Sequence, residues 1–136
     1  QLATFVMAWE SGRFQVVCSR ELADEYERVL ASPPIAQLIY PELLRAFRDH
    51  LTHDIEWVGL PFVPRLCRDP DDDKVIATAL FGGVSYLVSA DHDLHTPEIV
   101  QALRLAGIAI VTIDALIAIL DDERGTDTAD NEHRAR

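Results

Sequence analysis

The stretch from Asp69 to Asp93 reads DPDDDKVIATALFGGVSYLVSADHD and predicts a helix followed by a buried strand, with acidic residues at both ends. Apolar side chains recur at helical spacing after the first acids, and Gly82 and Gly83 end the helix. The run from Val84 to Val88 is typical of a strand inside a parallel sheet. Asp91 follows the carboxyl end of this strand, where open α/β sheets bind their ligands.

The acids that open this helix differ in direction, because each residue advances about 100° around the axis. Asp72 lies within the apolar face of the helix, whereas Asp71 and Asp73 lie on its flanks. The face consists of Val75, Ile76, Ala79 and Leu80. A carboxylate that points toward the end of the sheet is costly without a partner. Capping of the helix explains each acid alone, but Asp72 together with Asp91 favours a site.

The composition indicates one domain with a real core, since 49% of the 136 residues are hydrophobic. Cys18 and Cys67 follow no metal-ligand spacing and are interpreted as reduced, packed thiols, which suggests a cytoplasmic protein. No apolar run approaches the roughly 20 residues of a membrane span. The net charge of −11 argues against a broad basic surface for nucleic acid, but not against nucleic acid at an acidic, metal-filled site.

The rest of the chain alternates helices and strands. The expected elements are a helix over residues 1–11, a strand Phe14–Cys18, a helix from Ser19 to about Ala31, one or two helices over 35–53, a helix from Thr96 to Gly107, a strand Ile108–Val111 and a helix Asp114–Leu120. Pro61 and Pro64 make Ile55–Leu66 a short extended segment, not a central strand. This order predicts an α/β fold with a parallel sheet covered on both faces.

Glu25 lies at the border of the buried stripe of the helix after Phe14–Cys18, near the same carboxyl edge as Asp91; simple solvation is the alternative. Glu25, Asp72 and Asp91 thus come from three distant parts of the chain to one edge. Clustered carboxylates raise one another's pKa unless a cation shares them. Oxygen ligands without sulfur favour Mg²⁺ or Mn²⁺, which can orient a phosphate and activate water.

Four segments in this order resemble the PIN-domain family, in particular its bacterial branch described as toxins of toxin–antitoxin pairs. They are CSRELADEYERVL from Cys18, DPDDDKVIATAL from Asp69, YLVSADHDL from Tyr86 and GIAIVTIDALIAIL from Gly107. The resemblance implies a PIN-like, Rossmann-like three-layer α/β/α fold with a central parallel sheet, over residues 1–120. The polar residues 121–136 hold six acids, three arginines and no large apolar residue, so they predict a disordered tail.

The resemblance also implies an activity. It is that of a Mg²⁺- or Mn²⁺-dependent endoribonuclease, a hydrolase that cleaves single-stranded RNA, with an antitoxin protein as partner and a homodimer as its assembly. By carry-over, Glu25, Asp72 and Asp91 hold the metal and Asp93 supplies a further acid, with a turn residue as the alternative for Asp93. Ser89 could orient Asp91 or a substrate phosphate, or have no role.

One departure from the family is the opening strand, which ends in Asp-Thr-Asn in family members and has no counterpart upstream of Leu2. Its absence should remove one carboxylate and leave neighbouring backbone groups unpaired. The alternative function is therefore a catalytically incomplete PIN-like module that binds a protein partner or RNA. A phospho-acceptor receiver domain is a third hypothesis, but it needs a late lysine and none follows Lys74.

Three further residues imitate site residues. Asp114 begins the last helix and is interpreted as an ordinary helix N-terminus. His92 and His95 flank Asp93 but lack the partners and spacing of a zinc site.

Overall fold

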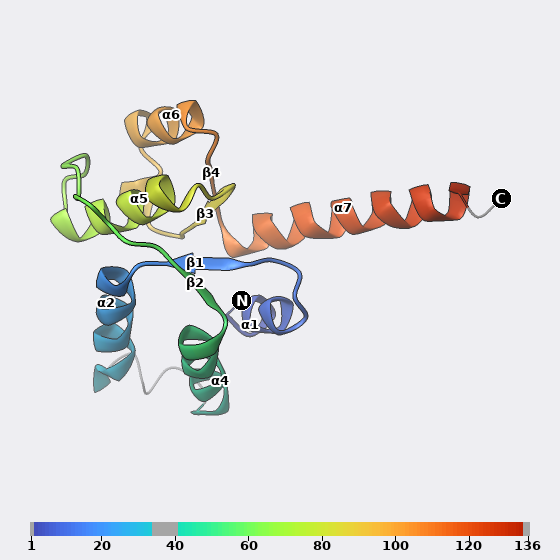
Figure 1. The fold of residues 1–136 in the computed structure, drawn as a ribbon, viewed down its shortest axis with the longest axis horizontal. Helices are drawn as coiled ribbons and strands as arrows, with labels where there is room; N and C mark the ends of the chain where they lie inside the picture. The colour runs from blue at the N-terminus through green and yellow to red at the C-terminus, as the bar shows by residue number, and fades with distance from the viewer. Residues whose placement is uncertain (1, 34–40, 135–136) are drawn as a thin grey trace.

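The computed structural model describes residues 2–33 and 41–134, as an α/β arrangement of helices around short strands (Figure 1). Its elements are α1 (Leu2–Glu10), β1 (Val16–Cys18), α2 (Arg20–Ala31), α4 (Pro41–His53), β2 (Ile55–Trp57), α5 (Pro70–Gly82), β3 (Tyr86–Val88), the 3₁₀-helix η1 (His92–Leu94), α6 (Pro97–Leu105), β4 (Ala109–Val111) and α7 (Ile113–Arg134). The part of the predicted 35–53 arm before residue 41 lies outside the described residues.

Among the described residues the strands form two parallel pairs, β1 with β2 and β3 with β4, which do not join into one sheet. The predicted α/β class with parallel strands is confirmed, but a single central sheet is not present in this part of the chain. The segment Ile55–Leu66, expected to be extended but not a central strand, begins with the short strand β2, which pairs with β1 alone among the described strands. Pro61 and Pro64 follow that ladder, so they remove no donor from it.

Local signals determine most helix ends. Ser19 caps α2, and its hydroxyl accepts a hydrogen bond from the N–H of Leu22. Gly83 ends α5 in the left-handed conformation with φ of 59°, which glycine adopts without steric cost. Gly107, with φ of 79°, follows Ala106, the C-cap of α6. The predicted helices at these positions are confirmed to within a few residues.

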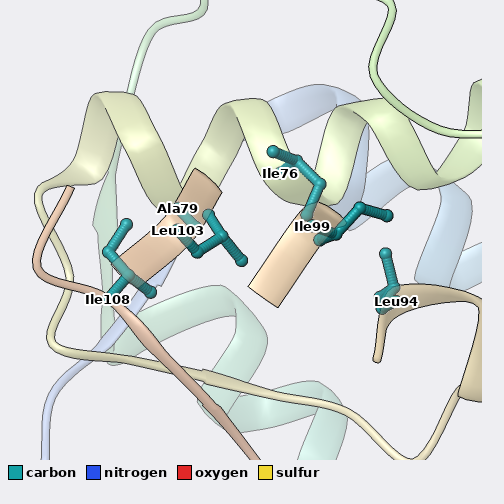
Figure 2. Close-up of a cluster of buried hydrophobic side chains, with 6 residues drawn as sticks. All are labelled: Ile76, Ala79, Leu94, Ile99, Leu103 and Ile108. Atoms are coloured by element: carbon teal, nitrogen blue, oxygen red, sulfur yellow. The ribbon is translucent and has the colours of Figure 1, made fainter. Parts of the chain in front are cut away.

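The main hydrophobic core lies between α5 and α6. Ile76 and Ala79 of α5 pack with Leu103 of α6 (Figure 2). Leu94, Ile99 and Ile108 complete the buried cluster. The helix that carries Asp72 in its first turn is therefore held in place by this core.

Helix α2 departs from the buried stripe that the sequence predicts for it, which consists of Leu22, Tyr26, Val29 and Leu30; the side chain of Leu30 lies outside the described part. Leu22 is buried, but Tyr26 and Val29 are 39% and 49% exposed. Leu22 and Tyr26 instead line a cavity beside β1. Tyr26 and Val29 of this stripe are therefore partly exposed where the sequence predicts a packed partner.

Helix α7 extends past its predicted end at Leu120 and runs through residues 121–134, the polar segment expected to be a tail. The later turns of this helix project away from the other elements (Figure 1). The sequence after Leu120 contains no proline, and Gly125 alone costs only about 1 kcal/mol in a helix. The domain boundary at residue 120 stays a prediction. No described helix combines the length and apolar character needed to cross a membrane.

Candidate metal centre

Three aspartates meet at the N-terminal end of α5. Oxygen atoms of Asp72, Asp91 and Asp93 lie within 4.8 Å of one another, so one cation could contact all three side chains. Asp72 is half-buried, and Asp91 and Asp93 are exposed. Three of the four residues expected at the site are thus brought together, from two segments about 20 positions apart in the sequence.

The first turn of α5 places Asp72. Asp69 is the N-cap, and its carboxylate accepts a hydrogen bond of 2.9 Å from the N–H of Asp71. Pro70 occupies the first helical turn, where its missing N–H is harmless. Asp72 therefore lies at the positive end of the helix dipole, where a negative charge is favoured.

The turn after β3 places the other two acids. The Asp91 carboxylate accepts a hydrogen bond of 3.0 Å from the N–H of Asp93, and the Asp91 N–H donates to the Ser89 hydroxyl oxygen at 3.0 Å. His95 fixes the same turn through a contact of 2.9 Å between its Nε2 and the Ser89 carbonyl. Ser89 thus orients the backbone of Asp91, one of the two roles the sequence left open.

The electrostatics of Asp72 reflect this crowding. Burial raises the pKa of Asp72, and the neighbouring charges of Asp91, Asp69, Asp93 and Asp71 raise it further. A carboxylate among like charges holds its proton more tightly until a cation shares the site. This perturbation is typical of functional sites, although structural clusters produce it too.

Glu25 is not a member of this aspartate group. Its Oε2 lies 3.9 Å from the Lys74 Nζ, which also lies 3.5 Å from Asp71 Oδ1. Lys74 therefore stands between α2 and the acidic turn of α5. In this arrangement Glu25 neutralises a lysine, and its assignment as a metal ligand stays a prediction.

Asp73 has a structural role that the sequence did not indicate. It is 3% exposed, although helical spacing placed it on a flank of α5. Its carboxylate accepts hydrogen bonds from the backbone N–H groups of Leu66, at 2.9 Å, and Cys67, at 2.7 Å. Burial alone would raise the pKa of Asp73, but these two donors outweigh burial and lower it. The loop before α5, which helical periodicity does not describe, folds back over this residue.

The remaining candidates lie outside the aspartate group of the described residues. This group contains neither histidine nor Asp114. Both cysteines are free. Burial raises the pKa of Cys18 to about 11, and burial together with Asp73 raises that of Cys67 to about 12. Both thiols are therefore protonated near neutral pH and poor metal ligands.

The three aspartates fit a hard divalent cation. Carboxylate oxygens without sulfur suit Mg²⁺ or Mn²⁺. The two exposed acids leave the site open to solvent, so a cation here could keep water molecules and accept a phosphate oxygen. The described residues thus supply a partial ligand set on an accessible edge.

Comparison with models of known protein families gives a match. A family model described as PIN domain matches residues 1–93, which is more than half of the chain and includes all three aspartates. No curated protein and no solved structure matches the chain.

Proposed function

We propose, from the premise that this chain belongs to the PIN-domain family, that it is a Mg²⁺- or Mn²⁺-dependent endoribonuclease acting on single-stranded RNA. PIN domains are generally metal-dependent nucleases. The observation that supports this proposal is the meeting of Asp72, Asp91 and Asp93 within 4.8 Å. A divalent cation bound there would neutralise phosphate charge and lower the pKa of a water molecule.

The residues of the chain have distinct tasks in this proposal. Asp72 supplies a half-buried carboxylate on a rigid helix, and Asp91 supplies one fixed by the N–H of Asp93. The exposed Asp93 faces the RNA side and completes the cation site. Glu25 acts as a fourth acidic ligand only if Lys74 moves away from it, for example to pair with a phosphate of the substrate.

The biological setting belongs to the same proposal. We assign the chain to the toxins of toxin–antitoxin pairs, acting in the cytoplasm as a homodimer that an antitoxin protein inhibits. The sequence segments quoted above support this assignment, in particular the pattern from Asp69 to Leu80.

The second candidate function is a catalytically incomplete PIN-like module that binds a protein partner or RNA. It is favoured by the position of Glu25, which is paired with Lys74 and outside the aspartate group. The two functions differ in one measurable property, because only the nuclease cleaves RNA.

The test is metal-dependent cleavage of a single-stranded RNA by the chain, beside Asp91→Asn and an EDTA control. Asp91→Asn keeps the oxygen that caps η1 but removes one negative charge. We expect cleavage with Mg²⁺ or Mn²⁺ that both controls abolish.

Asp114→Asn is the matched control variant, since it changes the same residue type outside the aspartate group. It should cleave like the parent. Equal loss in both variants would contradict the site assignment. A folded parent that binds Mn²⁺ but never cleaves would favour the binding module.

A further inference from the structure

Arg20 and Trp57 form a stacked pair at the ends of two adjacent strands. The guanidinium carbon Cζ of Arg20 lies 3.9 Å from the centroid of the Trp57 ring. Arg20 is the first residue of α2, directly after the cap Ser19, and Trp57 is the last residue of β2. In the parallel ladder Trp57 lies opposite Cys18, the last residue of β1. The stacked pair therefore lies at the carboxyl edge of β1 and β2.

The aspartate group lies at the same edge of the molecule. Ser19, just before α2, bonds to Thr78 in the middle of α5, whereas Glu25, farther along α2, contacts Lys74 nearer to the start of α5. Asp72 precedes Thr78 by about 9 Å along the helix axis, since each residue rises about 1.5 Å. Figure 1 shows the first turns of both helices on the same side of β1. The stacked pair is therefore a neighbour of the candidate metal centre.

The position of Arg20 is not explained by local stability. Its side chain is exposed, and no carboxylate of the described residues forms an ion pair with it. A cation in the first turn of a helix faces the positive end of the helix dipole, which disfavours it. Departures from such local rules are expected at functional sites.

A stacked guanidinium is well suited to bind an anion. Contact with the ring holds the planar group, while the N–H donors at its edge can bond to a phosphate in pairs. The positive end of α2 favours an anion at the same place. Arginine beside an aromatic ring is also a common combination in proteins that bind single-stranded nucleic acid. Because the net charge is −11, most of the chain repels RNA, and phosphate contacts need cations at fixed positions.

The lysine at the contact between α2 and α5 has partners already, because Lys74 lies between Glu25 and Asp71. We propose that Arg20 binds a backbone phosphate of the RNA strand beside the aspartate group, and that Trp57 positions its guanidinium. This inference rests on the proposed function, since it takes RNA as the substrate that crosses this edge. It adds a binding residue that contacts no metal.

The experiment measures RNA binding apart from cleavage. A fluorescein-labelled, single-stranded oligoadenylate of about 10 nucleotides is titrated with the full chain in EDTA. Fluorescence anisotropy gives Kd over a series of salt concentrations. The variants are Arg20→Ala and Trp57→Leu, of which the second keeps an apolar side chain in β2 but removes the ring.

Arg104→Ala is the matched control variant. Arg104 is exposed in the last turn of α6, which leads into the first residue of β4. Strand β4 is parallel to β3, so Arg104 lies at the amino edge of these strands, away from Asp91. The control removes the same charge from the opposite edge.

Arg20→Ala should weaken binding about 5- to 10-fold. It should also lower the magnitude of the slope of log K against log salt by about 0.7, the value for one phosphate contact on a single strand. Trp57→Leu should weaken binding about 3-fold and keep the slope, because the guanidinium remains but is less well held. The double variant should bind like Arg20→Ala alone. Arg104→Ala should change neither the affinity nor the slope.

Two results would overturn the proposal. The first is an equal Kd and an equal salt slope in Arg20→Ala and the parent. The second is the same loss of affinity in Arg20→Ala and Arg104→Ala, which would indicate general attraction by charge.

Cleavage with Mg²⁺ by the same proteins separates this proposal from the proposed function. A parent that binds RNA through Arg20 but never cleaves it would contradict the nuclease and support the phosphate contact. A parent that cleaves RNA while Arg20→Ala keeps its full affinity would contradict the contact and support the nuclease.

Discussion

At the scale of single residues, the three aspartates that could bind a cation also repel one another, and this repulsion lowers the stability of the metal-free chain. Burial raises the pKa of Asp72, and repulsion by the Asp91 carboxylate raises it further. We therefore expect Asp91→Asn to raise the Tm of the metal-free chain by about 1–3 °C. The same variant should lose most of the stabilisation that Mn²⁺ gives the parent.

Differential scanning fluorimetry in EDTA and in a Mn²⁺ titration measures both effects, with Asp114→Asn as the control. A lower metal-free Tm in Asp91→Asn, or equal Mn²⁺ stabilisation in parent and variant, would contradict a shared cation site at Asp72, Asp91 and Asp93.

Asp73 should behave in the opposite way, because its charge is stabilised by two backbone donors. Its pKa is lower in the folded chain, so its contribution is present above the ordinary value and is lost as pH falls through the folded value. At pH 7, Asp73→Ala should lower the free energy of unfolding by about 2–4 kcal/mol, since it leaves the N–H groups of Leu66 and Cys67 unpaired.

Urea denaturation at pH 7 and near pH 3 checks the Asp73 prediction. The deficit of Asp73→Ala should shrink at the lower pH, because the unfolded carboxylate binds protons there before the folded one does. Asp73→Asn, which keeps an acceptor oxygen, should cost less than the alanine variant. A deficit that does not depend on pH would mean that lost packing, not the charge, stabilises this loop.

At the scale of elements, a short hydrogen-bond chain joins α2 to α5. The Thr78 hydroxyl donates to the Lys74 carbonyl at 2.7 Å, so its single proton is used there. The Ser19 hydroxyl must then donate to Thr78 Oγ1, at 2.8 Å. Both side chains are almost fully buried. Thr78→Val keeps the shape but leaves the Ser19 proton without its acceptor.

We expect Thr78→Val to lower the free energy of unfolding by about 1–3 kcal/mol, measured by urea denaturation. The double variant with Ser19→Ala should cost less than the sum of the two single variants, because the second change removes the orphaned donor. Additive costs would contradict the hydrogen bond.

A second link, between α1 and α4, depends on pH. His50 Nδ1 lies 2.6 Å from Asp54 Oδ2, and its Nε2 lies 3.2 Å from Glu10 Oε1. Burial lowers the pKa of His50, but the hydrogen bonds to Asp54 and Glu10 outweigh it, so the folded value is raised above 6.5. The stabilisation is then fully present below the unfolded value and is lost as pH rises through the folded value.

His50→Gln should accordingly lower the free energy of unfolding by about 1 kcal/mol at pH 5.5 and by less at pH 8.5. The value is kept small because both carboxylates are exposed to solvent. Thermal unfolding of parent and variant at the two pH values checks this. A deficit that grows with pH would contradict the direction of the pKa shift.

The helix ends and the meeting of Asp72 with Asp91 could be predicted from the sequence. Ser19, Gly83 and Gly107 act through their own backbone neighbourhood, so a local pattern suffices to place helix ends. The proximity of Asp72 and Asp91 was also predictable, because one helix and one strand separate them. The pairing of Glu25 with Lys74 was not, since it depends on how α2 packs on α5.

At the scale of the whole molecule, long-range placement explains the remaining differences. The pairing of Ile55 with Val16 depends on the intervening arm. Tyr86 and Leu87 of β3 are half-buried, and β3 pairs with β4 alone among the described strands. A run of apolar residues predicts a buried strand but not whether its partner is present. The family match, by contrast, rests on residues 1–93 together.

The long helix α7 gives the last prediction, because only part of it packs on the rest of the molecule. Leu116 is buried, and Leu120 lines the cavity, but residues 121–125 are exposed. The ion pair of Arg13 with Asp121, at 2.6 Å, is partly exposed and contributes little to stability.

Isolated helices shorter than about 12–15 residues are marginally stable in water. Removal of residues 126–136 should therefore change Tm by less than about 1 °C, whereas a chain that ends at Ala115 should lose several degrees because it also loses Leu116. Thermal unfolding followed by circular dichroism measures both truncations, and a large loss of Tm in the shorter deletion would place the domain boundary beyond residue 120.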